Sequence, residues 1–168
     1  MTRDTITVLE NEKPLTYDID ALTLYHGYGF PGGVAHGFRV MQRAFALLSS
    51  DNPPERRSIS VRTAFRGPGA RDAFEMVTRS TSEERYVIDD ALAEPERGET
   101  LMRYVFHVSC GDETVRLHIR DGIVRDDFIA LGRKPDRTAQ EEERLVDLKR
   151  DMAERLFALP AHQIYEQY

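Results

Sequence analysis

A short segment between two expected helices gathers most of the residues that could do chemistry. It reads Tyr25-His26-Gly27-Tyr28-Gly29-Phe30-Pro31-Gly32-Gly33 and leads into the next helix. His26 would end the first helix, where an imidazole that titrates near neutral pH can act as a general acid or base, and Tyr28 could donate a hydrogen bond to a substrate oxygen. Each also has a structural interpretation, because His26 could cap helix carbonyls and the ring of Tyr28 could pack over the loop.

The start of the second expected helix could hold an anion. Pro31 is followed by Gly32 and Gly33, so backbone N–H groups at this start would be open to a carboxylate or phosphate. A Pro followed by Gly also opens helices for purely conformational reasons. The pattern therefore predicts ligand contacts at Gly32 and Gly33, with helix initiation as the alternative.

A second turn, Gly67-Pro68-Gly69, carries charged residues on both sides. Arg66 precedes it, and Arg71 and Asp72 follow in the first turn of another expected helix. Because a guanidinium beside free N–H groups can bind an anion in a fixed geometry, we predict that Arg66, Arg71 and Asp72 contribute to a ligand site. Alternatively, the arginines are solvated or pair with nearby acids, and Asp72 complements the helix dipole.

The remaining metal-type and nucleophilic residues are few. His36 follows the glycine run and could contact a ligand or, together with His26 and Asp72, hold a divalent metal. A polar position on the outer face of its helix is the other interpretation. The single cysteine, Cys110, excludes a disulfide within the chain and any Cys-rich zinc or iron–sulfur framework.

Composition sets the class of protein. The 168 residues are 40% hydrophobic and 31% charged, which is typical of one globular domain over residues 1–168. A formal net charge of −6 would repel a phosphate backbone, so no nucleic-acid partner is expected. The charged beginning of the chain and the absence of a long apolar run predict a cytoplasmic protein with no membrane partner.

Hydrophobic periodicity and turn residues predict the elements that position these groups. Asp18 and Gly27 bound a first helix, and an apolar stripe that begins with Val34 predicts a second helix that ends before Asp51. Alternation of apolar and polar residues over Ile59–Phe65 predicts a strand, and a helix is expected to follow it over about residues 70–79. This part of the chain is thus mostly helical.

The second half predicts an antiparallel meander and then helices. Strand patterns begin at Tyr86 and run through Leu101–Cys110, and a turn at Gly111-Asp112 pairs the latter with a strand that places His107 and His118 on one face. Asp121-Gly122 predicts another turn and a third strand over Ile123–Leu131. Helices are expected from about residue 136, where Thr138 and Glu141 are spaced as a capping box, and end in a short helix over Ala161–Tyr165. The predicted class is α+β, an antiparallel sheet packed with helices.

With these elements placed, the chain resembles the FmdE-like family, which takes its name from a component of formylmethanofuran dehydrogenase. The entry motif of that family has the form HGHxCPG, and here it reads HGYGFPG, from His26 to Gly32. Gly37, Arg39 and Arg71-Asp72-Ala73 are similar to later elements of the family, as is the ending from Leu159-Pro160-Ala161 to Tyr165-Glu166. The resemblance spans most of the chain and implies an FmdE-like α+β domain.

In that family the first histidine and the motif cysteine are associated with a metal site. His26 matches that histidine, but Tyr28 stands in place of the second histidine, Phe30 replaces the cysteine, and no cysteine occurs near residues 66–69. Loss of two thiolate ligands would remove most of the affinity for a soft metal, so we expect no zinc or nickel site of the family type.

The function predicted from these residues is binding of a small anionic organic ligand. Its pocket would be formed by the HGYGFPGG loop, the helix start at Gly32 and the turn from Arg66 to Asp72. As an enzyme it would be a metal-independent acid/base catalyst of the isomerase, decarboxylase or hydrolase type, with His26 and Tyr28 as catalytic residues. The alternatives are a divalent-metal-binding protein that uses His26, His36 and Asp72, or an accessory subunit of a larger enzyme. A homodimer is expected from general tendency.

Overall fold

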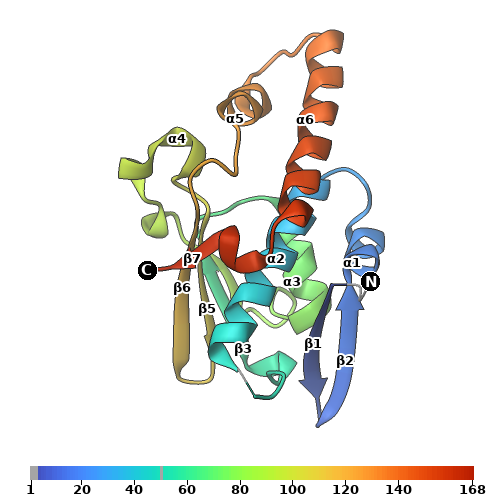
Figure 1. The fold of residues 1–168 in the computed structure, drawn as a ribbon, viewed down its shortest axis with the longest axis vertical. Coiled ribbons are helices and arrows are strands. Elements are labelled where there is room, and N and C mark those ends of the chain that lie inside the picture. Colours follow the sequence, from blue (N-terminus) through green and yellow to red (C-terminus); the bar gives the residue numbers. More distant parts are fainter. Residues whose placement is uncertain (1–3, 50) are drawn as a thin grey trace.

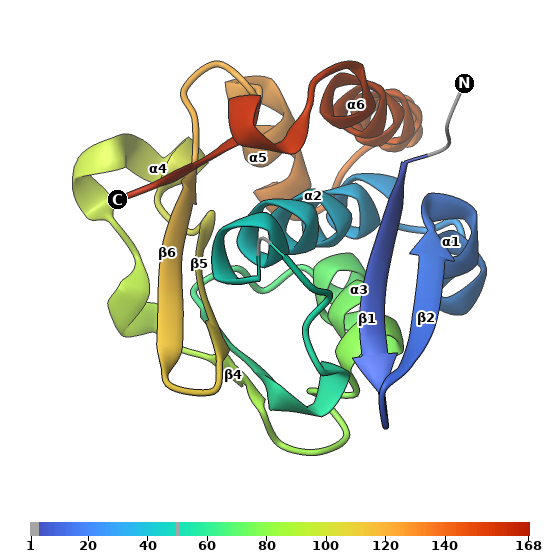
Figure 2. The same cartoon turned by 60° about the horizontal axis from the view of Figure 1, so that its bottom comes forward.

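A computed structural model describes residues 4–49 and 51–168, and it is mixed α and β as expected. Two central helices lie between a five-stranded sheet and a two-stranded hairpin (Figures 1 and 2). The central helices are α2 (Pro31–Leu48) and α3 (Pro68–Thr78). The sheet has the order β4-β3-β5-β6-β7, with bounds Tyr86–Ile88, Ile59–Thr63, Val105–Cys110, Glu113–Ile119 and Tyr165–Gln167.

Helix α2 is the centre of the core. The predicted apolar stripe is confirmed, since Val34, Phe38, Met41 and Phe45 are all buried. The helix packs against α3, against β6 and against the long helix α6 (Ala139–Ala158). Because three neighbours surround it, nearly every residue from 32 to 41 is buried, including the polar ones.

The N-terminal hairpin was not predicted from the sequence. Strands β1 (Thr5–Glu10) and β2 (Lys13–Asp18) pair antiparallel around Asn11 and Glu12, whose φ angles of 51° and 66° fit a tight two-residue turn. The hairpin leads directly into α1 (Ile19–His26). The predicted ends of this helix are confirmed, because the Asp18 carboxylate accepts from the Ala21 N–H and Gly27 has a φ of 91°.

Two parts of the predicted meander are wrong. The segment expected as a strand over Ile123–Leu131 forms helix α5 (Asp126–Arg133), where Phe128 and Ile129 pack against the core and two aspartates occupy the favourable first turn. The strand beside β6 is instead β7, from the end of the chain. β4 pairs parallel with β3, so the sheet is mixed, although β3, β5, β6 and β7 pair antiparallel.

The C-terminal region begins as expected and ends differently. Thr138 and Glu141 form the predicted capping box of α6, which buries Leu145, Leu148, Met152 and Leu156. The short helix expected over Ala161–Tyr165 is a single 3-10 turn, η4 (Ala161–Gln163), because the chain then joins the sheet. The other short helices are α4 (Gly98–Leu101), η1 (Arg56–Ser58), η2 (Asp90–Leu92) and η3 (Pro95–Arg97). Among the helices of the described residues, none has the length and apolarity needed to cross a membrane.

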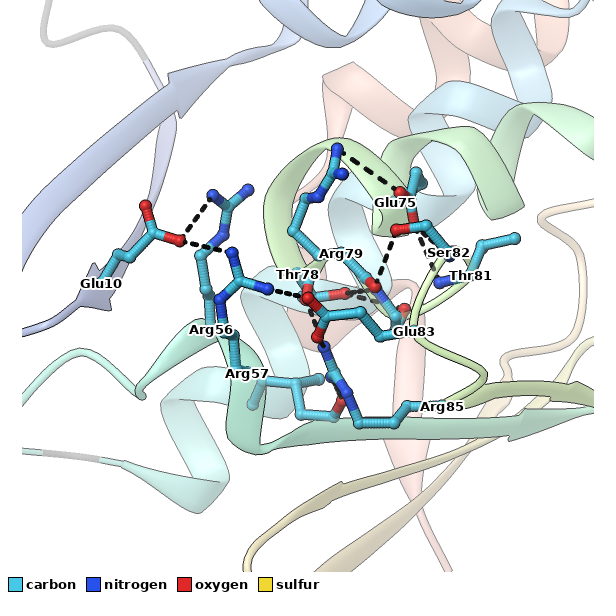
Figure 3. A network of polar contacts seen from close by, with 12 residues as sticks. Glu10, Arg56, Arg57, Glu75, Thr78, Arg79, Thr81, Ser82, Glu83 and Arg85 are labelled. Carbon is cyan, nitrogen blue, oxygen red and sulfur yellow. Dashed lines mark hydrogen bonds and ion pairs between the residues drawn. The ribbon is translucent and has the colours of Figure 1, made fainter.

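Ion pairs and hydrogen bonds of arginines connect the hairpin, η1 and the end of α3 (Figure 3). Arg57 pairs with Glu10 of β1 at 3.0 Å and also with Glu83 in the loop after α3. Arg85 donates to the Thr78 carbonyl at 2.9 Å, near the end of α3, and pairs with Glu83 at 2.7 Å. This polar network holds α3 against the hairpin and η1, and therefore fixes the residues at the N-terminus of α3 relative to α2.

Candidate functional site

A cavity of about 180 Å³ lies where the first turns of α2 and α3 meet. It is lined by Phe30, Gly32, Gly33, His36, Phe65, Gly67, Pro68, Gly69, Tyr104, Phe128 and Met152. The motif loop, the start of α2 and the turn before α3 all contribute to this lining. The structure thus brings together the three segments that the sequence predicts around a ligand.

The two helices can meet here because glycines stand at the crossing. A Cβ atom on Gly69 would lie 2.6 Å from the backbone nitrogen of Val34, and one on Gly33 would lie 3.2 Å from the Cα atom of Gly69. Backbone cannot move away as a flexible side chain can, so any larger residue at position 69 would push the helices apart. Gly33 is therefore a packing residue as well as part of the cavity wall.

Both helix starts at the cavity lack a capping side chain. Phe30 precedes α2 and Gly67 precedes α3, and neither helix has a side-chain hydrogen bond at its N-cap; each then begins with a proline. The first N–H groups of a helix need an acceptor, and the dipole makes this end partly positive. Two such ends at one cavity create an environment that favours a negative charge.

His36 supplies the polar side chain of the cavity. Its interpretation as a residue on the outer face of the helix is wrong, because α2 is covered on several sides and His36 is 1% exposed. Its Nδ1 lies 2.8 Å from the hydroxyl of Tyr165 in β7. Its Nε2 is buried and has no hydrogen-bond partner in the part of the chain that the structure describes. Burial lowers the pKa of His36 to about 3, so the ring is neutral at pH 7.

The hydrogen bond to Tyr165 determines which nitrogen carries the proton. Within the described residues the Tyr165 hydroxyl has no other partner, so it must donate to Nδ1 or leave its own proton unsatisfied. Burial raises the pKa of Tyr165, which keeps this proton on the oxygen. Nδ1 is then the acceptor, and Nε2–H is a donor with no acceptor among the described residues. An unpaired buried donor costs about 1–3 kcal/mol.

Aromatic rings form much of the rest of the wall. The ring of Tyr104 lies 4.9 Å from those of both His36 and Phe65, measured between centroids. Tyr104, Phe65, Phe128 and Met152 were not predicted as site residues. Phe65 follows the alternating pattern of β3, but the other three come from distant elements and give no local signal in the sequence. Their presence makes the cavity suited to a flat apolar group.

His26 and Asp72 form a pair beside the cavity. His26 Nδ1 lies 2.7 Å from Asp72 Oδ2, and the two side chains are 8% and 26% exposed. Arg71 reaches the other oxygen of Asp72 at 3.3 Å. None of the three lines the cavity, but the His26 ring packs against Phe30, which does, at 5.9 Å. A carboxylate that orients an imidazole is the arrangement found in general-base catalysis, and it also fixes α1 to α3.

The remaining predicted residues point elsewhere. Tyr28 is 80% exposed and lies along a separate hollow with Lys149 and Arg150 of α6. Arg66 is held outside the cavity by an ion pair with Asp90, which raises the pKa of the Arg66 guanidinium. Neither side chain contributes to the cavity that their neighbours line.

The alternative metal set is not assembled. His26 Nδ1 is taken by Asp72, whereas His36 Nδ1 is taken by Tyr165. Across residues 4–49 and 51–168, no group of three or more His, Cys, Asp or Glu side chains is arranged to hold a metal ion. His26, His36 and Asp72 therefore do not form such a group in the described residues.

No protein-family model matches the chain, and a comparison with curated proteins finds no match either. The chemistry of this cavity is therefore assigned from the residues around it.

Proposed function

We propose that this chain binds a small anionic organic molecule in the cavity between the first turns of α2 and α3. The observation that carries the proposal is the buried His36 Nε2–H, a donor without an acceptor beside two uncapped helix starts. A carboxylate would accept from this donor and would be favoured by both helix dipoles.

The size and walls of the cavity favour an acid with a single ring. Its volume of about 180 Å³ is below the roughly 300–1,000 Å³ that drug-sized ligands occupy. A flat ring would contact the aromatic lining residues Phe30, Phe65, Tyr104 and Phe128, and His36 would meet its acidic group. Benzoate is the simplest molecule with this chemistry.

Titration with benzoate and with its neutral isostere benzamide tests the proposal by calorimetry. We expect benzoate to bind at least about tenfold more tightly, because a charged acceptor strengthens the bond to Nε2–H. The double variant His36→Phe/Tyr165→Phe removes the donor, keeps both rings and leaves no hydroxyl unpaired, so it should lose this preference. The exposed His162 offers the matched control His162→Phe, which should retain it. Equal binding of both probes to parent and double variant would contradict the proposal.

A second candidate function is metal-independent acid/base catalysis of the isomerase, decarboxylase or hydrolase type. The 2.7 Å pair of His26 and Asp72 favours it, since the carboxylate would orient the imidazole that moves the proton. Phenylacetate has exchangeable hydrogens next to its carboxylate, so deuterium uptake at that carbon would report such catalysis. The uptake should disappear in His26→Gln, and uptake that survives this change would exclude His26 as the base.

Four further proposals rest on the sequence: membership of the FmdE-like family, a homodimer, a cytoplasmic location and a role as an accessory component of a larger enzyme. Sedimentation of the purified chain would test the homodimer directly.

A further inference from the structure

The face of the sheet turned away from α2 carries two rows of polar side chains. Arg62 on β3 is directly opposite His107 on β5, and His107 is directly opposite Arg116 on β6. A second row lies two residues away along each strand and has the same register. It consists of Ser60, Ser109 and Thr114. Since alternate residues of a strand share a face, both rows lie on one surface. Figure 2 shows β5 and β6 side by side on this side of the molecule.

These six residues, with Val61, line a hollow of about 290 Å³. It lies on the opposite side of the sheet from the cavity of His36, because the alternate residues Ile59, Val61 and Thr63 of β3 face the core. The Ser109 and Thr114 hydroxyls are 2.7 Å apart, and the Ser60 hydroxyl has no side-chain partner among the described residues. The hollow thus offers hydroxyl donors along one edge and cationic groups along the other.

The cationic row is incompletely neutralised. Arg62 pairs with Asp89, but no acid pairs with Arg116 in the part of the chain that the structure describes. Arg62 and Arg116 each lie directly opposite His107, so two guanidiniums flank one imidazole. Burial, Arg116 and Arg62, in that order of size, lower the pKa of His107, with Glu94 and Asp89 acting in the opposite direction. The Tyr168 hydroxyl lies 2.9 Å from His107 Nε2. An anion over this row would face both guanidiniums.

We infer that this surface is a binding site for the phosphate group of a small phosphorylated molecule. Adjacent strands are about 4.8 Å apart and the two rows about 7 Å apart, so a tetrahedral anion between them can meet donors from both rows. A planar carboxylate has acceptors on one edge only and would use a single row. The hollow has no aromatic wall, which distinguishes its ligand from the one proposed for the cavity of His36.

Inorganic phosphate and ribose 5-phosphate are the probes, titrated by calorimetry into the full chain. Arg116→Gln removes an exposed guanidinium that has no acidic partner among the described residues, so the fold should tolerate it. Arg150→Gln, on α6, makes the same charge change at a side chain that is 67% exposed. We expect Arg116→Gln to weaken phosphate binding about tenfold or more and Arg150→Gln to leave it unchanged. Tighter binding of ribose 5-phosphate identifies a phosphomonoester ligand, and equal binding identifies free phosphate as sufficient.

Sulfate provides a second measurement, because its charge stays constant between about pH 8 and about pH 6. A bound dianion raises the pKa of His107, so sulfate should bind more tightly as the pH falls through this range, and His107→Gln should abolish the trend. The inference is overturned if Arg116→Gln and Arg150→Gln bind phosphate equally, or if neither probe binds at millimolar concentration. It is also overturned if a short single-stranded RNA binds more tightly than both probes through Arg116, since the occupant would then be nucleic acid.

Discussion

Acidification should destabilise this protein through His36 before its carboxylates titrate. The buried ring has a folded-state pKa of about 3, whereas an unfolded histidine has a pKa near 6.5. Below about pH 6.5 the unfolded state therefore binds a proton that the folded state does not, and stability falls with pH. From about pH 7 to about pH 5 this difference amounts to about 2 kcal/mol at one site. The loss would continue down to the folded-state pKa.

Urea denaturation at several pH values measures this effect. The unfolding free energy is plotted against pH for the parent and for His36→Phe/Tyr165→Phe, and the two slopes are compared. Each protein is referred to its own stability at neutral pH, so a general loss of stability in the variant does not affect the comparison. Between about pH 7 and about pH 5, the unfolding free energy of the variant should fall by about 2 kcal/mol less than that of the parent. His107 also has a lowered pKa and contributes a smaller slope of the same sign, so His107→Gln is measured alongside. An unchanged slope in the double variant would refute the assignment of the buried neutral state to His36.

Two other predictions concern packing and reactivity. Gly37→Ala should lower the unfolding free energy measured in urea by about 1–3 kcal/mol, because its Cβ would lie 2.8 Å from that of Ala73. The control Gly132→Ala in α5 meets open space and should raise the unfolding free energy by up to about 1 kcal/mol. Equal effects would contradict the close approach of α2 and α3. Alkylation of Cys110 by iodoacetamide at neutral pH should be slower than that of a free thiol, because burial and Glu113 raise the pKa of Cys110; the difference should vanish in denaturant, and a fast-reacting native thiol would argue against it.

Helices with local start or stop signals could be predicted from the sequence. Asp18 and Gly27 delimit α1, and Thr138 with Glu141 starts α6, because each signal acts through hydrogen bonds within a few residues. β7 could not be predicted in this way. A strand of three residues has little preference of its own, and it forms because the edge of β6 offers unpaired backbone groups.

The candidate site divides along the same line. The segments that line the cavity were predicted, because glycine and proline mark the close helix starts in the sequence. His36 was predicted as a ligand contact, but its burial and its hydrogen bond to Tyr165 were not, because Tyr165 lies 129 positions later in the chain. Arg66 was predicted as a ligand contact, but the nearby Asp90 takes its guanidinium. Pairings of this kind depend on which distant elements meet.

The glycine-rich run and the cavity have a common physical cause. Gly33 and Gly69 allow the starts of α2 and α3 to approach within backbone contact, and the same absence of side chains leaves the space that His36 and the aromatic residues surround. Pro31 and Pro68 begin both helices without capping side chains, so the close approach of the helices also brings their N-terminal ends together. A sequence that packs two helix starts so closely places their partly positive ends at one cavity, and His36 lies in the wall of that cavity.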